Sequence, residues 1–321
     1  MAAYAVLCLS AADCPAIAQA NFVTFDVSGS AGTYPTGINA EGAVTGYYFD
    51  INGNQYAFLR SSKGIITIID PDESHTVGAS GLNRGKSVTG YYADSDSNFV
   101  GYVRSAKGKF VTFLPEGSTE IDPLAINAAG SVTGFYRINS TRFGFVRTSD
   151  GTLSEFKPKK SSQTLPQGID DSGRVTGYYQ EADGDVRGFV RAADGLVKTF
   201  DIKGQTYPFG INNKGDVVGQ FSINGANPSG FVRSAKGKVT TFDPAGSETT
   251  WPYAINAEGT IAGKYSDGTM VHAFLRSSKG KITTFDPAGS FDTEAYAINE
   301  SGAITGFYED DAGTHGFIRT P

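Results

Sequence analysis

The chain has 321 residues and a formal net charge of −6, from 27 Lys and Arg against 33 Asp and Glu. This charge argues against nucleic acid and anionic membrane surfaces as partners. No segment approaches the roughly 18 consecutive apolar residues of a membrane span, so membrane insertion is not expected. Its 41 Gly, 22 Phe and 16 Tyr are typical of a β-rich, turn-rich chain.

Residues 1–20 differ in composition from the rest. They are apolar and rich in small residues, contain both cysteines, Cys8 and Cys14, and end in Ala18-Gln19-Ala20, which resembles a signal-peptide cleavage site. We therefore expect a signal-like segment over 1–20 and a secreted or periplasmic protein whose cleaved form has no cysteine. The segment lacks a basic beginning, and an acidic residue and a proline interrupt its apolar run, so a truncated or misassigned start is the alternative.

One repeated unit fills residues 21–321. Its signature reads Gly-Ile-Asn-Ala-Glu-Gly-x-Val-Thr-Gly-Tyr-Tyr, and the spacings between its Asn or Asp are 44, 44, 43, 42, 44 and 43 residues. A fixed period of this size indicates a supersecondary unit that buries its faces against its neighbours. The repeated position is occupied by Asn39, Asn83, Asn127, Asp170, Asn212, Asn256 and Asn299.

Each unit is predicted to contain four short strands. In the unit around Asn256 these are 252–256, 260–265, 272–276 and 281–286, which alternate apolar and polar residues between Gly- and Asx-containing turns. Seven such units predict an all-β fold, a seven-bladed β-propeller with four antiparallel strands per blade. An open solenoid is the alternative, but it usually needs polar capping repeats at its ends.

The two ends of the repeat region complement each other. The chain begins with a fourth-strand sequence at 22–26 and stops on a third-strand sequence at 315–319. Pairing the N-terminal strand with the C-terminal blade would close the ring and remove exposed sheet edges. We therefore predict a single propeller domain over 21–321.

These motifs resemble the HAF-type extracellular repeat family of bacterial secreted proteins. The matching residues are His272-Ala273-Phe274 and His315-Gly316-Phe317 at the third strand, with Thr-Phe-Asp-Pro at 241–244 and 284–287. The resemblance covers residues 22–320 and implies a secreted propeller. The resemblance implies no set of catalytic residues.

Residues that recur between units are predicted to be structural. His272 and His315 occupy the family's third-strand position. The second-strand Gly, such as Gly134, is expected to mark close approach of backbone. The Arg that ends each third strand is predicted to pair with the Asp of the fourth strand, and a ring of cations for an anionic ligand is the alternative. These arginines are Arg60, Arg104, Arg147, Arg191, Arg233, Arg276 and Arg319.

The variable loops are where a site is expected, because binding residues concentrate on loops held by a rigid scaffold. The loops that lead into the first strands and those that join strands two and three share one face, here called the loop face. Weak catalytic candidates there are His75, Glu120, Asp122, Asp292 and Glu294. Candidates for ligand binding are Tyr34, Tyr207, Trp251, Gln163 and Gln205.

We expect no cofactor and no metal site. Ca²⁺ in the acid-rich loops 94–98 and 181–185 is the alternative, although neither loop matches the spacing of an EF-hand.

The sequence favours a secreted, monomeric binding module for a neutral glycan, with aromatic rings stacking on sugars and carboxylates accepting hydroxyl hydrogen bonds. The first alternative is a polysaccharide-degrading enzyme at the same face, a glycosidase with two carboxyls or a lyase. A lyase is disfavoured because Arg137, Arg142 and Arg187 supply too few cations for a polyuronate. A structural or protein-interaction scaffold is the second alternative.

Overall fold

The computed structural model describes residues 21–321, so the signal-like segment 1–20 lies outside the described residues. Within that range the chain forms 28 β-strands and no helix. The expectation of an all-β fold is confirmed. No helix in the described part is long and apolar enough to cross a membrane.

The strands fall into four positions that recur along the chain. The first strands are β2 (Ser30–Ile38), β6 (Val77–Leu82), β10 (Glu120–Ile126), β14 (Ser161–Ile169), β18 (Gln205–Ile211), β22 (Thr249–Ile255) and β26 (Asp292–Ile298). The second strands are β3 (Val44–Asp50), β7 (Val88–Ala93), β11 (Val132–Ile138), β15 (Val175–Glu181), β19 (Val217–Ser222), β23 (Ile261–Ser266) and β27 (Ile304–Asp310). The third strands are β4 (Gln55–Arg60), β8 (Phe99–Arg104), β12 (Thr141–Arg147), β16 (Val186–Arg191), β20 (Ser229–Arg233), β24 (Val271–Arg276) and β28 (Gly313–Thr320). The fourth are β5 (Ile66–Ile69), β9 (Phe110–Phe113), β13 (Leu153–Phe156), β17 (Val197–Phe200), β21 (Val239–Phe242), β25 (Ile282–Phe285) and, beside β28, β1 (Asn21–Phe25).

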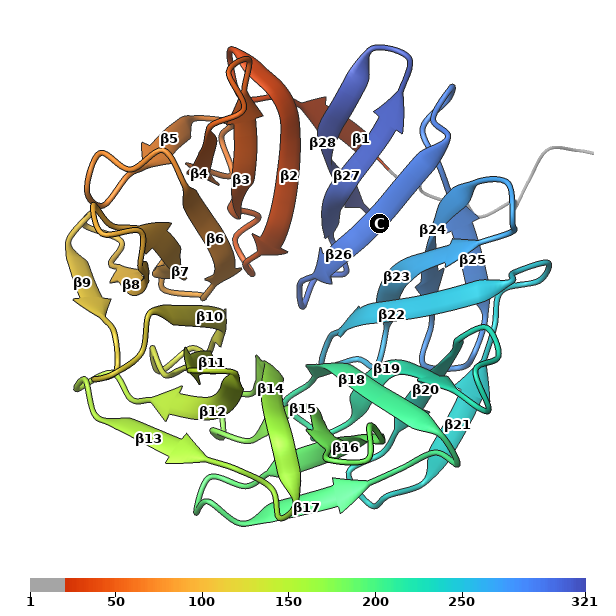
Figure 1. The fold of residues 1–321 in the computed structure, drawn as a ribbon. Helices are drawn as coiled ribbons and strands as arrows, with labels where there is room; N and C mark the ends of the chain where they lie inside the picture. Colours follow the sequence, from red (N-terminus) through yellow and green to blue (C-terminus); the bar gives the residue numbers. More distant parts are fainter. Residues whose placement is uncertain (1–20) are drawn as a thin grey trace, which may run out of the picture.

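Strands that follow one another within a unit pair antiparallel, as in the sheet β18-β19-β20-β21. Units 1 to 6 begin with β2, β6, β10, β14, β18 and β22, and unit 7 consists of β26, β27, β28 and β1. Figure 1 shows the units arranged around a central axis, with the first strands innermost. The end of the chain meets its beginning, because β1 pairs antiparallel with β28 from Asn21↔Thr320 to Phe25↔Gly316.

Second-strand glycines allow the first two strands of each unit to approach closely. A Cβ on Gly134 would lie 2.0 Å from the carbonyl oxygen of Asp122, and one on Gly306 would lie 1.8 Å from that of Glu294. The register of the two strands shifts just beyond this contact, between Pro123 and Ala125 in unit 3. Only glycine fits there, so the predicted close approach of backbone is confirmed.

The core is formed between units by the aromatic residue of each third strand. Phe58, Tyr102, Phe145, Phe189, Phe231, Phe274 and Phe317 are fully buried. The second-strand Thr also points inward, and Thr45 Oγ1 donates to the Phe58 carbonyl at 2.8 Å. Each unit therefore contributes one large apolar side chain to a layer against its neighbour.

The predicted ion pair between the third-strand Arg and the fourth-strand Asp is wrong. The guanidinium instead lies over the fourth-strand Phe of the preceding unit, with Arg147 4.7 Å from the ring centroid of Phe113. Six of the seven arginines make this contact, at 4.6–5.2 Å. A cation over an aromatic face is attracted by the ring quadrupole, so this Arg joins units instead of pairing within one.

Candidate functional site

A run of aromatic side chains crosses units 6, 7 and 1 on their first and second strands. Tyr253 and Tyr296 stack with centroids 4.8 Å apart, Tyr296 stacks on Phe307 at 5.8 Å, and Phe307 meets Tyr34 edge-on at 5.0 Å. Tyr34 continues the run by stacking on Tyr47 at 5.1 Å. Burial raises the pKa of Tyr47 to about 12, so its hydroxyl stays neutral and can donate a hydrogen bond.

The paired aromatics of the second strands point to opposite sides of the sheet. The first member faces the inner strand, as Tyr47 does towards Tyr34, and the second packs on the third strand, as Tyr48 does on Tyr56 at 5.6 Å. This division follows from the two-residue period of a strand.

Two pairs of carboxyl groups lie on first strands at the end nearest the loop face. In each pair one carboxylate has a cation partner: Glu120 bonds Arg137 at 2.7 Å, and Glu294 bonds Lys264 at 2.6 Å. The other member, Asp122 or Asp292, has an unpartnered buried oxygen among the described residues.

Burial, and then the neighbouring Glu120, raise the pKa of Asp122 to about 6. Burial and the neighbouring Glu294 raise the pKa of Asp292 to about 6. Each pair thus combines one carboxylate bonded to a cation with one carboxyl that changes its protonation near neutral pH.

The structure brings Glu120 and Asp122 together with aromatic rings. A cavity of about 210 Å³ is lined by these two carboxyls with Tyr91 and Phe99. The two rings meet edge-on at 5.5 Å. Two predicted catalytic candidates therefore share one small pocket between units 2 and 3.

Trp251 and Glu294 are linked through a lysine that sequence reasoning did not select. Lys264 Nζ lies 5.2 Å from the centroid of the Trp251 ring and bonds Glu294. The lysine is held by both contacts, and Glu294 Oε2 keeps no partner in the described structure. Trp251 is half-buried and lies two residues before Tyr253 on β22.

The remaining predicted residues lie apart from this group. Gln163 Oε1 accepts from Arg142 N at 2.9 Å and Gln205 Oε1 accepts from Val186 N at 2.7 Å, so both amides link neighbouring units. Tyr207 meets Tyr178 edge-on at 5.1 Å. His75 is exposed and its Nδ1 bonds the Tyr56 hydroxyl at 2.9 Å.

The two third-strand histidines are tied to carboxylates. His272 Nδ1 lies 2.8 Å from Asp286 and His315 Nδ1 lies 2.9 Å from Asp26. These carboxylates raise the pKa of both imidazoles against the opposing effect of burial. The fourth-strand Asp thus pairs with this His where one is present.

The acid-rich loops form turns closed by their own side chains. Asp94 Oδ1 accepts from the main-chain N–H groups of Asp96 and Asn98 at 3.0 and 2.8 Å. Within residues 21–321 no group of three or more His, Cys, Asp or Glu is arranged to hold a metal ion.

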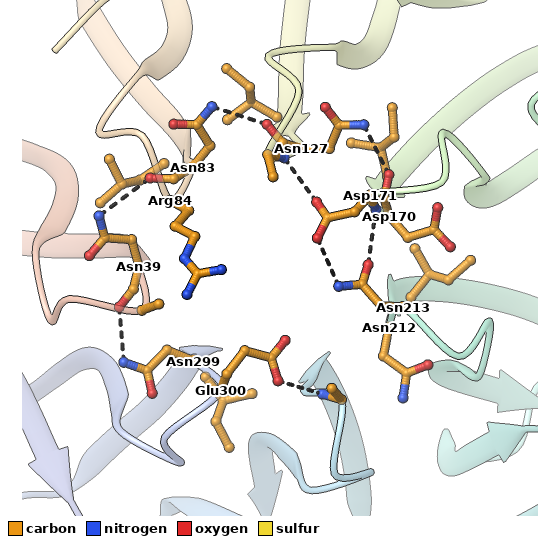
Figure 2. Close-up of a pocket in the computed structure, with 18 of the residues that line it drawn as sticks. Asn39, Asn83, Arg84, Asn127, Asp170, Asp171, Asn212, Asn213, Asn299 and Glu300 are labelled. Carbon is orange, nitrogen blue, oxygen red and sulfur yellow. Dashed lines mark hydrogen bonds between the residues drawn. The ribbon is translucent and has the colours of Figure 1, made fainter.

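A larger cavity, of about 520 Å³, lies at the opposite ends of the same inner strands (Figure 2). Its wall consists of the last residue of each first strand and the residues that follow it. The seven residues of β10 span about 20 Å, which sets the distance along the wall between Glu120 at the loop face and this cavity. No predicted site residue lines the cavity.

Repeated asparagines connect the units around this cavity. Six Asn side chains donate through Nδ2 to the main-chain carbonyl of the equivalent residue in the next unit, at 2.9–3.3 Å. One of these bonds joins Asn299 of unit 7 to Asn39 of unit 1. Asp170 cannot donate, and there Arg174 bonds Asp170 at 2.5 Å and reaches the Asn213 carbonyl at 2.9 Å.

Sequence reasoning identified the repeated Asn but missed four further polar residues of this cavity, namely Arg84, Asp171, Asn213 and Glu300. They occupy the position directly after the repeated Asn. That position varies in side-chain chemistry within an otherwise repeated signature, which is the signal that could have found them.

The arrangement of strands defines an all-β protein of the propeller class. No protein-family model matches the sequence, and no curated protein matches it. The resemblance to HAF-type repeats therefore stays a prediction.

Solved propeller structures are similar to the chain. Virginiamycin B lyase from Staphylococcus aureus shares 15% identity at a TM-score of 0.62, with 94% of this chain and 100% of that chain covered. A streptogramin B lyase shares 15% identity at a TM-score of 0.59, covering 94% and 98%. The β-propeller domain of the Trilobed protease from Pyrococcus furiosus shares 11% identity at a TM-score of 0.65, covering 90% and 94%. At these identities the likeness shows the fold alone.

Proposed function

We propose that the seven units are the blades of one closed β-propeller. Three contacts between the two ends of the repeat region support this: the β1–β28 ladder that completes unit 7, the Asn299–Asn39 hydrogen bond and Arg60 over Phe25 at 4.7 Å. Deleting residues 21–27 then removes the last strand of unit 7 and broadens thermal unfolding. A melting transition as sharp as that of the full chain would contradict closure.

The proposed activity is ligand binding at the loop face, with a neutral glycan as the ligand. The observation that carries it is the aromatic run beside carboxyl groups with unpartnered oxygens. Aromatic faces can stack on the apolar faces of sugar rings, and buried polar atoms without partners favour a ligand that supplies hydroxyl donors. A monomeric, exported protein is part of the same proposal.

Retention on immobilised neutral and acidic polysaccharides tests this binding. We expect retention on a neutral glycan, with loss in Trp251→Ala and little change in Leu196→Ala, an exposed apolar residue in a turn on the opposite face. Both variants should keep melting temperatures within a few degrees of the parent. Retention on acidic polysaccharides alone, or equal retention of both variants, would contradict the proposal.

The raised pKa values of Asp122 and Asp292 favour a second candidate, a glycosidase. A carboxyl with a pKa of about 6 can act as a general acid near neutral pH while a neighbouring ionised carboxylate stabilises developing positive charge. If so, Asp122→Asn or Asp292→Asn abolishes release of reducing sugar from a retained glycan without abolishing retention. Parent protein that releases no sugar from any retained glycan would leave binding as the function.

A further inference from the structure

Only some of the main-chain N–H groups around the 520 Å³ cavity donate a hydrogen bond to another residue. We call the residue after each repeated Asn the rim residue. Where a rim side chain can accept, it bonds the main-chain N–H of the rim residue one unit earlier. Asp171 accepts from Ala128 N, Asn213 from Asp171 N and Glu300 from Ala257 N, each at 2.9 Å. The rim residues are Ala40, Arg84, Ala128, Asp171, Asn213, Ala257 and Glu300.

The remaining four rim N–H groups have no partner among the described residues. Three of them, on Glu300, Ala40 and Arg84, belong to the consecutive units 7, 1 and 2. They stay open because the following rim residue is Ala40, Arg84 or Ala128, none of which carries an acceptor. One arc of the rim is therefore a row of open main-chain donors.

Arg84 adds a charge to this arc. Its side chain is exposed, points into the cavity and has no ion-pair partner among the described residues (Figure 2). The nearby carboxylates are already engaged, because Glu300 turns back to Ala257 and Asp171 reaches Ala128 and Asn213. The Arg84 guanidinium and three of the four open donors thus lie along one arc of the cavity, and the carboxylates of Glu300 and Asp171 bond N–H groups of units 6 and 3 outside this arc.

We propose that this arc, formed by the N–H groups of Glu300, Ala40 and Arg84 with the Arg84 guanidinium, binds the carboxylate of a small organic ligand. The protein itself supplies the precedent, since the carboxylates of Asp171 and Glu300 occupy the equivalent N–H groups of units 3 and 6. The guanidinium can hold a carboxylate through two parallel hydrogen bonds. A cavity of about 520 Å³ is within the range of small-molecule sites.

The test uses NMR spectra of the full-length, ¹⁵N-labelled protein, in which the main-chain amide signals are observed directly. Sodium acetate is titrated at constant ionic strength, with acetamide as the uncharged match and sodium phosphate as the other oxyanion. We expect saturable shifts of the Ala40, Arg84 and Glu300 amides and of Arg84 Nε with acetate only, and about tenfold weaker binding in Arg84→Gln. No saturable shift with acetate, or a stronger response to phosphate, would overturn the proposal.

Two variants with the same added charge separate the arc from the rest of the rim. Ala40→Asp places a carboxylate where it can accept from Glu300 N, as Asp171 does from Ala128, and should abolish acetate binding. Ala257→Asp would instead reach Asn213 N, outside the arc, and should keep a saturable though weaker response. Equal loss in both variants would mean that only the net charge of the cavity matters. The spectra also report folding, and neither measurement depends on glycan binding at the loop face.

Discussion

The repeated asparagine forms hydrogen bonds with both the oxygen and the nitrogen of its side-chain amide. In unit 1, Asn39 Oδ1 accepts from Glu41 N and Ala43 N, closing its own turn, while Nδ2 donates to the next unit. Aspartate can do only the first of these. Asp170 is accordingly followed, four residues on, by Arg174, whose guanidinium restores a bond to the next unit. The sequence showed that Asn recurs, but not that one Asp is compensated.

Asp122 and Asp292 should make stability depend on pH. Each pKa is raised to about 6, whereas an unfolded carboxyl titrates near 3.9, so the folded state holds protons that the unfolded state has lost. Their contribution to stability is full below about pH 4 and is lost as the pH rises through 6. Relative to the double variant Asp122→Asn/Asp292→Asn, the parent should lose stability over this interval in urea unfolding.

The same comparison cancels the contribution of the two third-strand histidines to the pH dependence of stability. The pKa values of His272 and His315 are also raised, but both residues are present in parent and variant, so their effect cancels. A difference in unfolding free energy that stays constant from pH 4 to 7 would show that these carboxyls titrate normally.

At the scale of the strand, alternation and turn residues were sufficient to predict most elements. The third strand predicted at 272–276 is observed as Val271–Arg276, and the fourth, predicted at 281–286, as Ile282–Phe285. The first strand was expected to begin at residue 252 but begins at Thr249. The register shift between Pro252 and Ala254 breaks its alternation, which hid the earlier residues.

Contacts between strands of different units were harder to predict. The third-strand Arg was assigned to an Asp in its own unit because both recur, yet it lies over a Phe more than thirty residues earlier, as Arg147 does over Phe113. A repeat shows which positions are equivalent. It does not show which of them meet across the gap between units, because every unit offers the same residues.

Gly134→Ala tests the close approach of first and second strands. The new Cβ would lie 2.0 Å from the Asp122 carbonyl oxygen and 2.9 Å from the Pro123 Cα, so backbone must move. We expect a loss of about 2–3 kcal/mol in unfolding free energy, at the upper end for an overpacked site. Gly85→Ala, whose nearest neighbour would be 3.4 Å away, should change stability by less than about 1 kcal/mol. Similar losses in the two variants would refute the steric explanation.

At the scale of the molecule, the repeat predicted the architecture better than the site. The loop face was chosen because its loops vary most, and the prediction of a site there stays a prediction, although Glu120 and Asp122 do share a pocket with two aromatic rings. The cavity at the opposite ends of the inner strands was missed because its variable polar residues, such as Arg84 and Glu300, are embedded in the most regular part of the signature. Their significance depends on hydrogen bonds between units, which a linear pattern does not contain.

We call the contact between two neighbouring units at the repeated Asn a joint. The substitution Asn299→Asp tests the joint between unit 7 and unit 1. It removes the donor to the Asn39 carbonyl and adds a buried charge, and residue 303 is Ala, so no arginine compensates. We expect a loss of about 2–4 kcal/mol in unfolding free energy. Asn256→Asp makes the same change at an internal joint, where the residue four positions on is the uncharged Thr260.

A closed ring predicts similar losses at the two joints, because both then carry the same hydrogen bond from Asn Nδ2 to the carbonyl of the next unit. Adding Thr260→Arg to Asn256→Asp copies the Asp170–Arg174 pair at a similarly half-buried position and should recover part of the stability. If Asn299→Asp is much milder than Asn256→Asp, the ring is open between units 7 and 1. Urea unfolding of the four proteins separates these outcomes, since the free energy of unfolding of one cooperative body registers the loss of any joint.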